Sequence, residues 1–213
     1  MKPSVLITGF GPFPGVPVNA SGALARRLAA AARRRYPGIA IHSAVLPTQW
    51  RLGPVRAERA ITRVQPDIAI HFGVSAQAQG FVIERRAVNV CLSHADGVGE
   101  LPPLALLDPN GPKRRAVTLP VAAIVKRLRA LGLPAASSDH AGTYLCNAVL
   151  YRSLGLTVGS RAIAGFVHIP ASLAGGDACP LAASQALAGG LEILAVCLEQ
   201  DRFQRNQRQT GAD

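Results

Sequence analysis

The sequence predicts an α/β protein, a three-layer α/β/α sandwich built on a mostly parallel central sheet. Short apolar segments of strand length alternate with longer segments that carry apolar residues at helical spacing. Most connections between them are short, which favours strands and helices that alternate along the chain. The predicted strand over 67–72 is also apolar enough to be covered on both faces, as strands of parallel sheets are.

In the first third of the chain we expect strands over 4–8, 39–46 and 67–72, and helices over 21–35 and 54–64. Ser21 is the candidate N-cap of the first helix, which Pro37 and Gly38 close. Pro54 suits the first turn of the second helix, because an amide at that position has no partner within the helix.

The rest of the chain begins with residues 81–90, which predict a strand or hairpin arm. The loop that follows to Gly111 is long enough to be functional or mobile. Thr118 is the candidate cap of a helix that ends near Leu131. Further on, we expect strands over 135–138 and 160–169 and helices over 143–154 and 180–200. Residues 1–201 are predicted to form a single domain, and residues 202–213 a basic polar tail that frays.

Composition argues against several classes of protein. No apolar run is long enough to span a membrane and the N-terminus lacks a signal peptide, so we expect a cytoplasmic protein without a membrane partner. The 4 cysteines include no CxxC pair and are too few for a disulfide scaffold. The 5 histidines show no HxH or HExxH spacing, and the loop over 9–15 has no GKS or GKT, so we expect neither a metal nor a cofactor.

The net charge of +11 comes mainly from arginine. Such a field favours anionic partners, nucleic acid included. However, the basic residues are spread over predicted helix faces and the C-terminal tail, and the aromatic residues, 5% of the chain, do not interleave with them. Because a base-stacking platform is missing, we interpret the charge as solvated helix faces rather than as a nucleic-acid site.

Three reactive side chains lie where a cysteine hydrolase would need them. Cys146 lies at the start of a predicted helix, whose positive dipole end favours a thiolate. His168 lies near the end of a predicted strand, and Glu84 lies among apolar residues of another. Carboxyl ends of parallel strands share one edge of a sheet, so we expect Cys146 and His168 to meet at that edge. Taken singly, a helical cysteine is more often a core residue, and Glu84 could pair with Arg85 or Arg86.

Four motifs, in matching order, resemble those of the pyroglutamyl peptidase I family of cysteine peptidases, also called pyrrolidone-carboxylate peptidases. The likeness extends to about residue 200. Residues 6–21, LITGFGPFPGVPVNAS, are similar to the family's TGFxPFxGxxxNPS. Residues 84–89, ERRAVN, are similar to its ERxAxN box, residues 141–147 to its AGTYLCN box, and residues 166–170, FVHIP, to its FxHxP box.

The resemblance implies removal of N-terminal pyroglutamate (5-oxoproline) from peptides. Cys146 would attack the carbonyl that joins pyroglutamate to the next residue. His168 would pair with the thiolate and then protonate the departing amine, while Glu84 would orient His168 and stabilise its charge. The family is often tetrameric, so the resemblance also implies a homo-oligomer.

The resemblance further implies a pocket for the lactam ring, with the substrate-binding residues Phe10, Phe13, Tyr144 and Asn19. A neutral, flat ring suits apolar and aromatic walls with a few amide hydrogen bonds. Backbone groups of the glycine-rich loop over 9–15 could supply those bonds and an oxyanion donor. The chain departs from the family pattern at Pro14, at Ala20, at His94 and over 72–75, and these changes bear on pocket shape and substrate preference.

Two alternatives remain open. The first is a related cysteine amidohydrolase or acyltransferase on the same scaffold, its specificity altered by Pro14 and the variant residues 72–75. The second is a basic binding protein that has kept the scaffold without catalysis. The presence of all three reactive side chains argues against the second alternative, because a binding protein has no chemical need for them together.

Overall fold

The computed structural model describes residues 2–174 and 179–210. The strands are β1 (Ser4–Phe10), β2 (Ala40–Leu46), β3 (Ile68–Ser75), β4 (Phe81–Glu84), β5 (Arg86–Val88), β6 (Arg114–Ala116), β7 (Ala135–Ser138) and β8 (Ile163–Pro170). The helices are α1 (Ala20–Arg35), α2 (Gly53–Val64), α3 (Val121–Ala130), α4 (Leu145–Thr157) and α5 (Ala183–Thr210), with a 3-10 turn η1 (Ala171–Ala174). The predicted alternation of strands and helices is present. The sequence analysis did not separate β5 from β4, and it did not include β6.

The central sheet has six strands in the order β2-β1-β3-β8-β4-β7. Parallel pairing joins β2 to β1, β1 to β3, β3 to β8, and β4 to β7. Among the strands of this sheet in the described residues, β4 and β8 alone pair antiparallel, through Val82–His168 and Ile83–Val167. The prediction of a mostly parallel sheet is therefore confirmed, with β4 and β7 reversed relative to the other four strands. The short strands β5 and β6 form a separate antiparallel pair.

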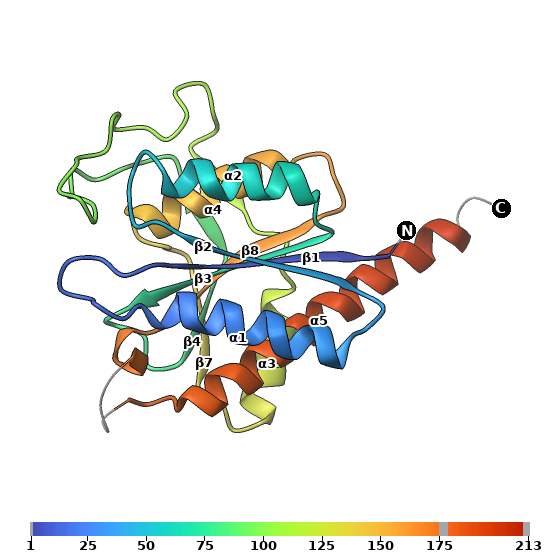
Figure 1. The fold of residues 1–213 in the computed structure, drawn as a ribbon. Coiled ribbons are helices and arrows are strands. Elements are labelled where there is room, and N and C mark those ends of the chain that lie inside the picture. Colours follow the sequence, from blue (N-terminus) through green and yellow to red (C-terminus); the bar gives the residue numbers. More distant parts are fainter. Residues whose placement is uncertain (1, 175–178, 211–213) are drawn as a thin grey trace.

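The side chains of each strand alternate between two cores, one on each face of the sheet. On β8, Val167 and Ile169 join the core formed with α1, α3 and α5, whereas Phe166 joins the core formed with α2 and α4. Figure 1 shows the same division, with α2 and α4 on one side of the strands and α1, α3 and α5 on the other. The predicted α/β/α sandwich is confirmed. By the same alternation, His168 points toward the side of α4.

Two predicted helix caps were wrong. Asn19, not Ser21, caps α1, because its Oδ1 accepts hydrogen bonds from both the amide and the hydroxyl of Ser21. Thr118 does not cap α3, which begins after Pro120 without a side-chain cap. The Thr118 hydroxyl instead donates to the Ala162 carbonyl and accepts from the Ala164 amide, so it ties the chain to β8.

The tail over 202–213 was expected to fray. In its described part α5 continues to Thr210, and residues 211–213 lie outside the described residues. Two contacts explain the difference. Arg205 pairs with the buried Asp201 one helical turn earlier, at 2.7 Å, and with Asp67 next to β3, at 2.8 Å. Within the described residues, no helix is both long and apolar enough to cross a membrane.

Candidate active site

His168 and Glu84 lie side by side on neighbouring strands. His168 is on β8 and Glu84 ends β4, and the antiparallel register places both side chains on the face covered by α4. The Nδ1 atom of His168 lies 2.8 Å from Oε1 of Glu84, and both side chains are almost fully buried. Since Nδ1 then carries the proton and donates it to the carboxylate, Nε2 is left to face the nucleophile.

Glu84 is available to His168 because its neighbours in the sequence bind elsewhere. Arg85 pairs with the Asp139 carboxylate, and Arg86 donates to the Asp139 carbonyl at 3.0 Å. The alternative in which Glu84 pairs with an adjacent arginine is therefore wrong. The second carboxylate oxygen of Glu84, Oε2, is buried without a hydrogen-bond partner among the described residues.

Cys146 reaches the same face by a route that differs from the expected one. Because β7 runs opposite to β8, the carboxyl ends of these strands do not share an edge of the sheet. The chain instead turns back after β7 through Gly142, whose φ of +79° is strained for other residues, and enters α4 directly. Cys146 is the second residue of α4, so its sulfur lies over the sheet at the positive end of the helix dipole.

A glycine on β3 provides the space for this sulfur. Gly73 pairs with His168 in the sheet register, and a Cβ atom at Gly73 would lie 2.9 Å from Sγ of Cys146 and 2.6 Å from the Phe166 ring. Sequence reasoning noted Gly73 only as part of the variant stretch over 72–75. Its role could not be read from the sequence, because it depends on a contact between residues far apart in the chain.

The electrostatics of the three side chains favour an ion pair. Burial lowers the pKa of His168, but the Cys146 thiolate and the Glu84 carboxylate outweigh burial and raise it to about 10. The imidazole thus stays protonated at neutral pH, between the sulfur and the carboxylate. A protonated imidazole next to a thiolate can stabilise the nucleophile and later supply a proton.

Asn147 fixes the helix of Cys146 to the segment that follows Glu84. Its buried side chain accepts from the Val88 amide at 2.9 Å and donates to the carbonyls of Val88, at 2.8 Å, and Val90, at 3.2 Å. These three hydrogen bonds join α4 to the segment over 88–90, which is more than 50 residues away in the sequence. Sequence reasoning missed Asn147, and the signal was a polar amide next to Cys146 in the otherwise apolar stretch 145–151.

The three side chains open into a cavity of about 450 Å³. Its walls come from β3 and the loop after it, from β4, β7 and β8, from the loop that precedes α4, and from α4 itself. Besides the three reactive residues, the lining consists of Val74, Ser75, Gln77, Ala78, Val82, Ser138, His140, Ala141, Gly142 and Tyr144. Tyr144, predicted from the sequence as a pocket residue, is therefore in the cavity wall.

Aromatic neighbours and one hydrogen bond hold Tyr144 in place. Trp50 and His94 contact its ring edge-to-face, at centroid distances of 5.1 Å and 5.4 Å. Its hydroxyl donates to the Ala95 carbonyl at 3.2 Å. Burial and the nearby negative charges of Asp96 and Cys146 raise the pKa of Tyr144 to about 12, so the phenol remains a neutral donor.

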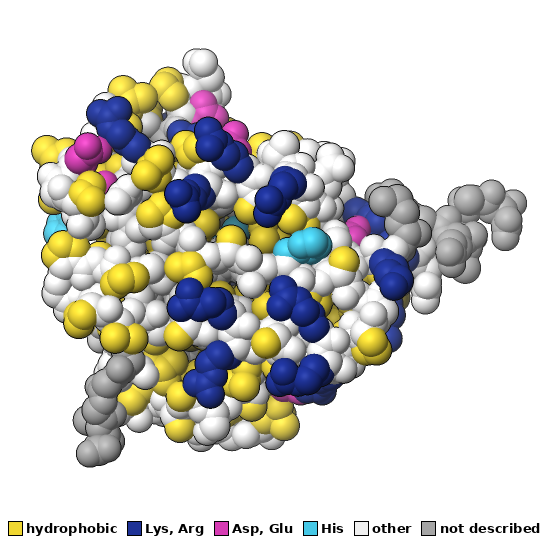
Figure 2. Space-filling model, viewed as in Figure 1, with side chains coloured by type: hydrophobic (Ala, Val, Ile, Leu, Met, Phe, Trp, Pro, Cys, Tyr) yellow, Lys and Arg dark blue, Asp and Glu magenta, His cyan; other side chains and the backbone are white. Residues whose placement is uncertain are grey.

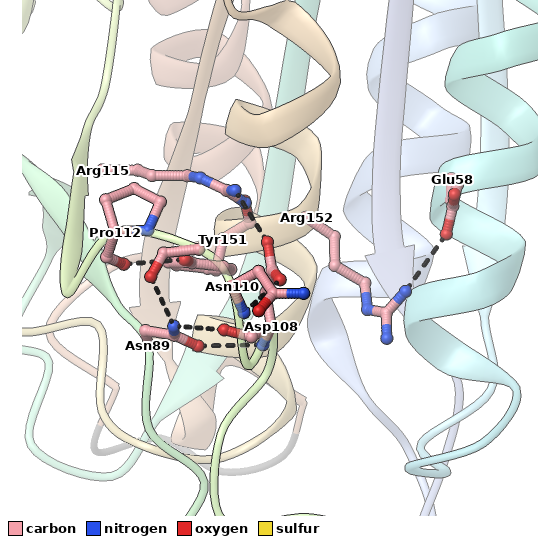
Figure 3. Close-up of polar contacts among 9 residues, drawn as sticks. Glu58, Asn89, Asp108, Asn110, Pro112, Arg115, Tyr151 and Arg152 are labelled. Carbon is pink, nitrogen blue, oxygen red and sulfur yellow. Dashed lines mark hydrogen bonds and ion pairs between the residues drawn. The ribbon is translucent and has the colours of Figure 1, made fainter.

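The loop that supports Tyr144 is anchored at its base (Figure 3). Asn89 donates to the Asp108 carbonyl and accepts from the Asp108 amide, while the Asp108 carboxylate pairs with Arg115 at 3.2 Å. Arg115 stacks on the Tyr151 ring, 3.9 Å from its centroid, and the Tyr151 hydroxyl donates to the Pro112 carbonyl. This network ties the 89–113 loop to α4, the helix that carries Cys146.

The other three predicted pocket residues, Phe10, Phe13 and Asn19, are not among the described residues that line the cavity. Phe10 is buried against Phe166, with ring centroids 6.5 Å apart, and supports the sheet face below His168. Phe13 forms a bridge with Val16, and Asn19 caps α1. The loop over 9–15 was expected to offer free amides, but the Gly11 and Phe13 amides already bond to backbone carbonyls and the Phe10 amide to the Ser21 hydroxyl.

Comparison with known proteins adds an independent line of evidence. The family model described as "Pyroglutamyl peptidase" matches residues 3–175. The pyrrolidone-carboxylate peptidase of Chromobacterium violaceum is 37% identical over 168 residues, covering 78% of this chain and 77% of the relative. Pyrrolidone-carboxylate peptidase 1 of Ralstonia nicotianae is 36% identical over 90% of each chain.

Solved structures agree with these sequence matches. A mutant pyrrolidone carboxyl peptidase from Pyrococcus furiosus superimposes with a TM-score of 0.83 at 30% identity, over 92% of this chain and 99% of the other. Pyroglutamyl peptidase I of Bacillus amyloliquefaciens superimposes with a TM-score of 0.80 at 31% identity, over 92% and 96%. With this sequence, this fold and this arrangement of a cysteine, a histidine and a glutamate, the chain belongs to the pyroglutamyl peptidase family of cysteine peptidases.

Proposed function

We propose that this chain removes pyroglutamate from the N-terminus of peptides, with Cys146 as nucleophile, His168 as acid and base, and Glu84 as the residue that orients His168. The observation that carries the proposal is the continuous contact from Cys146 through His168 to Glu84, at the wall of a cavity, in a member of the pyroglutamyl peptidase family.

The reaction follows from the ion pair. The Cys146 thiolate attacks the carbonyl carbon between pyroglutamate and the next residue, and the carbonyl oxygen takes up negative charge. When the tetrahedral species collapses, the C–N bond breaks and the imidazolium of His168 gives its proton to the departing amine, which leaves a thioester on Cys146. His168, now neutral, takes a proton from water as the water attacks the thioester. Collapse then releases free pyroglutamate and restores the thiolate beside the imidazolium.

The cavity suits a neutral lactam. Glu84 is the single carboxylate among its lining residues, and that carboxylate is engaged by His168. An ordinary peptide would bring a charged α-amine into the cavity without a free carboxylate to pair with it, which is unfavourable. Pyroglutamate has no such charge, and its ring can pack against Val74, Val82 and Tyr144. Direct substrate contact by Phe10, Phe13 and Asn19 stays a prediction.

The test is release of a chromogenic amine from a pyroglutamyl amide. We expect hydrolysis by the native chain and a loss of about a thousandfold or more in Cys146→Ser, because a neutral hydroxyl is a far weaker nucleophile than a thiolate. Cys179→Ser is the matched control, since Cys179 is a half-buried cysteine outside the cavity. Full activity in Cys146→Ser would contradict the mechanism. Hydrolysis of open-chain acyl amides, with the lactam amide left intact, would instead identify a related amidohydrolase.

We also propose a homo-oligomer in the cytoplasm. Six large apolar side chains of the 89–113 loop are exposed, a surface typical of protein contacts: Val90, Leu92, Val98, Leu101, Leu104 and Leu106. All 4 cysteines are free thiols, as is usual in a reducing compartment. Sedimentation of the native chain should give a mass near four chains, and Leu101→Glu with Leu104→Glu should lower it. A monomer at micromolar concentration would contradict the proposal.

A further inference from the structure

The strand β2 is an open edge of the central sheet. It is the terminal strand in the sheet order, and it pairs with β1 over its whole length. The Ala40 amide donates to the Pro3 carbonyl and the Leu46 carbonyl accepts from the Gly11 amide, and both partners flank β1. In a parallel strand the backbone groups of alternate residues point to opposite sides. The amides and carbonyls of Ile41, Ser43 and Val45 therefore face away from β1, toward the open edge.

Arginines flank this edge on both faces of the sheet. On α2, the exposed Arg56, Arg59 and Arg63 recur at i, i+3 and i+7, so they form one stripe. On α1, the exposed Arg26 and Arg33 are two turns apart, and Arg33 Nε donates to the Ile41 carbonyl at 3.0 Å. Because α1 and α2 cover opposite faces of the sheet, the edge of β2 lies between the two rows.

Carboxylates do not balance these charges. Neither α1 nor β2 contains an acidic residue, and the one acidic residue of α2, Glu58, pairs with Arg152 of α4. Within residues 2–174 and 179–210, these five arginines have no ion-pair partner. Figure 2, which views the molecule from the same side as Figure 1, shows dark-blue side chains gathered above and below the middle of this face and few magenta ones among them.

We propose that the β2 edge and its flanking arginines bind an extended acidic segment of another protein, which adds to the sheet as a further strand beside β2. The backbone groups of Ser43 and Val45 would supply main-chain hydrogen bonds. Successive side chains of an added strand point to opposite faces of the sheet. Consecutive Glu or Asp residues on the segment would therefore meet the α2 row on one face and the α1 row on the other, as guanidinium–carboxylate pairs.

Charge complementarity selects this occupant. A second copy of the chain, paired through its own β2, would bring the same arginines against each other, and like charges oppose such pairing. Nucleic acid would use the arginines but not the alternating backbone groups of a strand edge. Arginines can also protect an edge from unwanted pairing, and Arg129 bonds to the Ala135 carbonyl of the opposite edge strand β7 in a similar way. Protection without a partner is therefore the outcome against which the proposal is tested.

The experiment measures binding of a dye-labelled peptide, acetyl-Glu-Glu-Val-Glu-Glu-Val-Glu-amide, by fluorescence anisotropy at about 0.15 M salt, where exposed charges are moderately screened. We expect saturable binding to the full chain. Charge reversal in Arg56→Glu/Arg59→Glu/Arg63→Glu should weaken it by about ten-fold or more, because three exposed attractions become repulsions. Peptidase activity should not change, since these residues lie outside the active-site cavity.

The matched control is Lys113→Glu/Arg114→Glu/Lys126→Glu, which makes the same change in net charge on exposed residues away from β2. It should leave peptide binding within about two-fold. A second peptide, methylated at alternate backbone nitrogens, should bind about ten-fold more weakly because it cannot pair with a strand edge. Absence of binding, equal loss in the control variant, or equal affinity of the methylated peptide would each overturn the proposal. Tighter binding of random duplex DNA than of the peptide would also overturn it.

Discussion

Replacement of Glu84 by Gln tests the electrostatic coupling in the active site. The Glu84 carboxylate lies 2.8 Å from Nδ1 of His168, and the side chains are 2% and 10% exposed. Gln has nearly the same shape and its amide oxygen can still accept from Nδ1, so the change removes the charge and keeps the contact. The charge stabilises the imidazolium, and its loss must therefore lower the pKa of His168.

The size of the effect follows from burial. A hydrogen bond to a charged group contributes about 1.5–3 kcal/mol, which corresponds to about one to two pH units. The pKa of His168, which is about 10 in the native chain, should fall by that amount. Activity needs the protonated imidazole to donate to the leaving amine. The basic limb of the pH profile should therefore move to lower pH, and activity near pH 9 should fall more than activity near pH 7.

The assay is kcat/KM for a pyroglutamyl amide measured from pH 6 to pH 11 in the native chain and in Glu84→Gln. Glu100→Gln is the matched control, because it also removes one carboxylate, in an exposed pair with Arg51. Its basic limb should coincide with that of the native chain. A basic limb that stays in place in Glu84→Gln would refute the idea that this carboxylate holds the proton on His168.

Two more predictions concern the sheet beneath the site. Gly73→Ala should lower kcat/KM by about ten-fold or more, because the added methyl group would overlap Sγ of Cys146 and the Phe166 ring; Gly38→Ala, at a site with open space, should leave it unchanged. Burial lowers the pKa of His71 from 6.5 to about 4. The neutral ring therefore contributes about 3 kcal/mol to the free energy of unfolding above pH 6.5, and this contribution is lost as the pH falls through about 4. Urea unfolding between pH 7 and pH 4 should show this loss in the native chain and a shallower one in His71→Gln; equal slopes would contradict it.

The sequence predicted the elements that depend on local pattern. The strands and helices follow the spacing of apolar residues, and the fold class follows from their alternation. The caps at Ser21 and Thr118 were wrong because both residues are acceptable caps locally, and tertiary contacts decide otherwise. Asn19 binds Ser21, and Thr118 binds backbone groups beside β8.

For the active site, the residue types could be predicted but their route to one another could not. Cys146, His168 and Glu84 were chosen from position and motif, and the structure brings them together. The expected meeting at a shared sheet edge failed because nothing in the sequence indicates that β4 and β7 are reversed. The roles of Gly73 and Asn147 were not predicted for a related reason, since each depends on a contact with a residue distant in the chain.

The pairing between β4 and β8 has a consequence for how the enzyme fails on heating. These strands share two residue pairs, fewer than any other neighbours in the six-stranded sheet. Glu84 comes one residue after the second pair. A brief opening of the β4–β8 pairing would therefore separate the Glu84 carboxylate from the His168 imidazole while the two cores stay folded. Short ladders open at a lower free-energy cost than the whole molecule. Catalytic activity should therefore be lost at a lower temperature than the one at which the helices unfold.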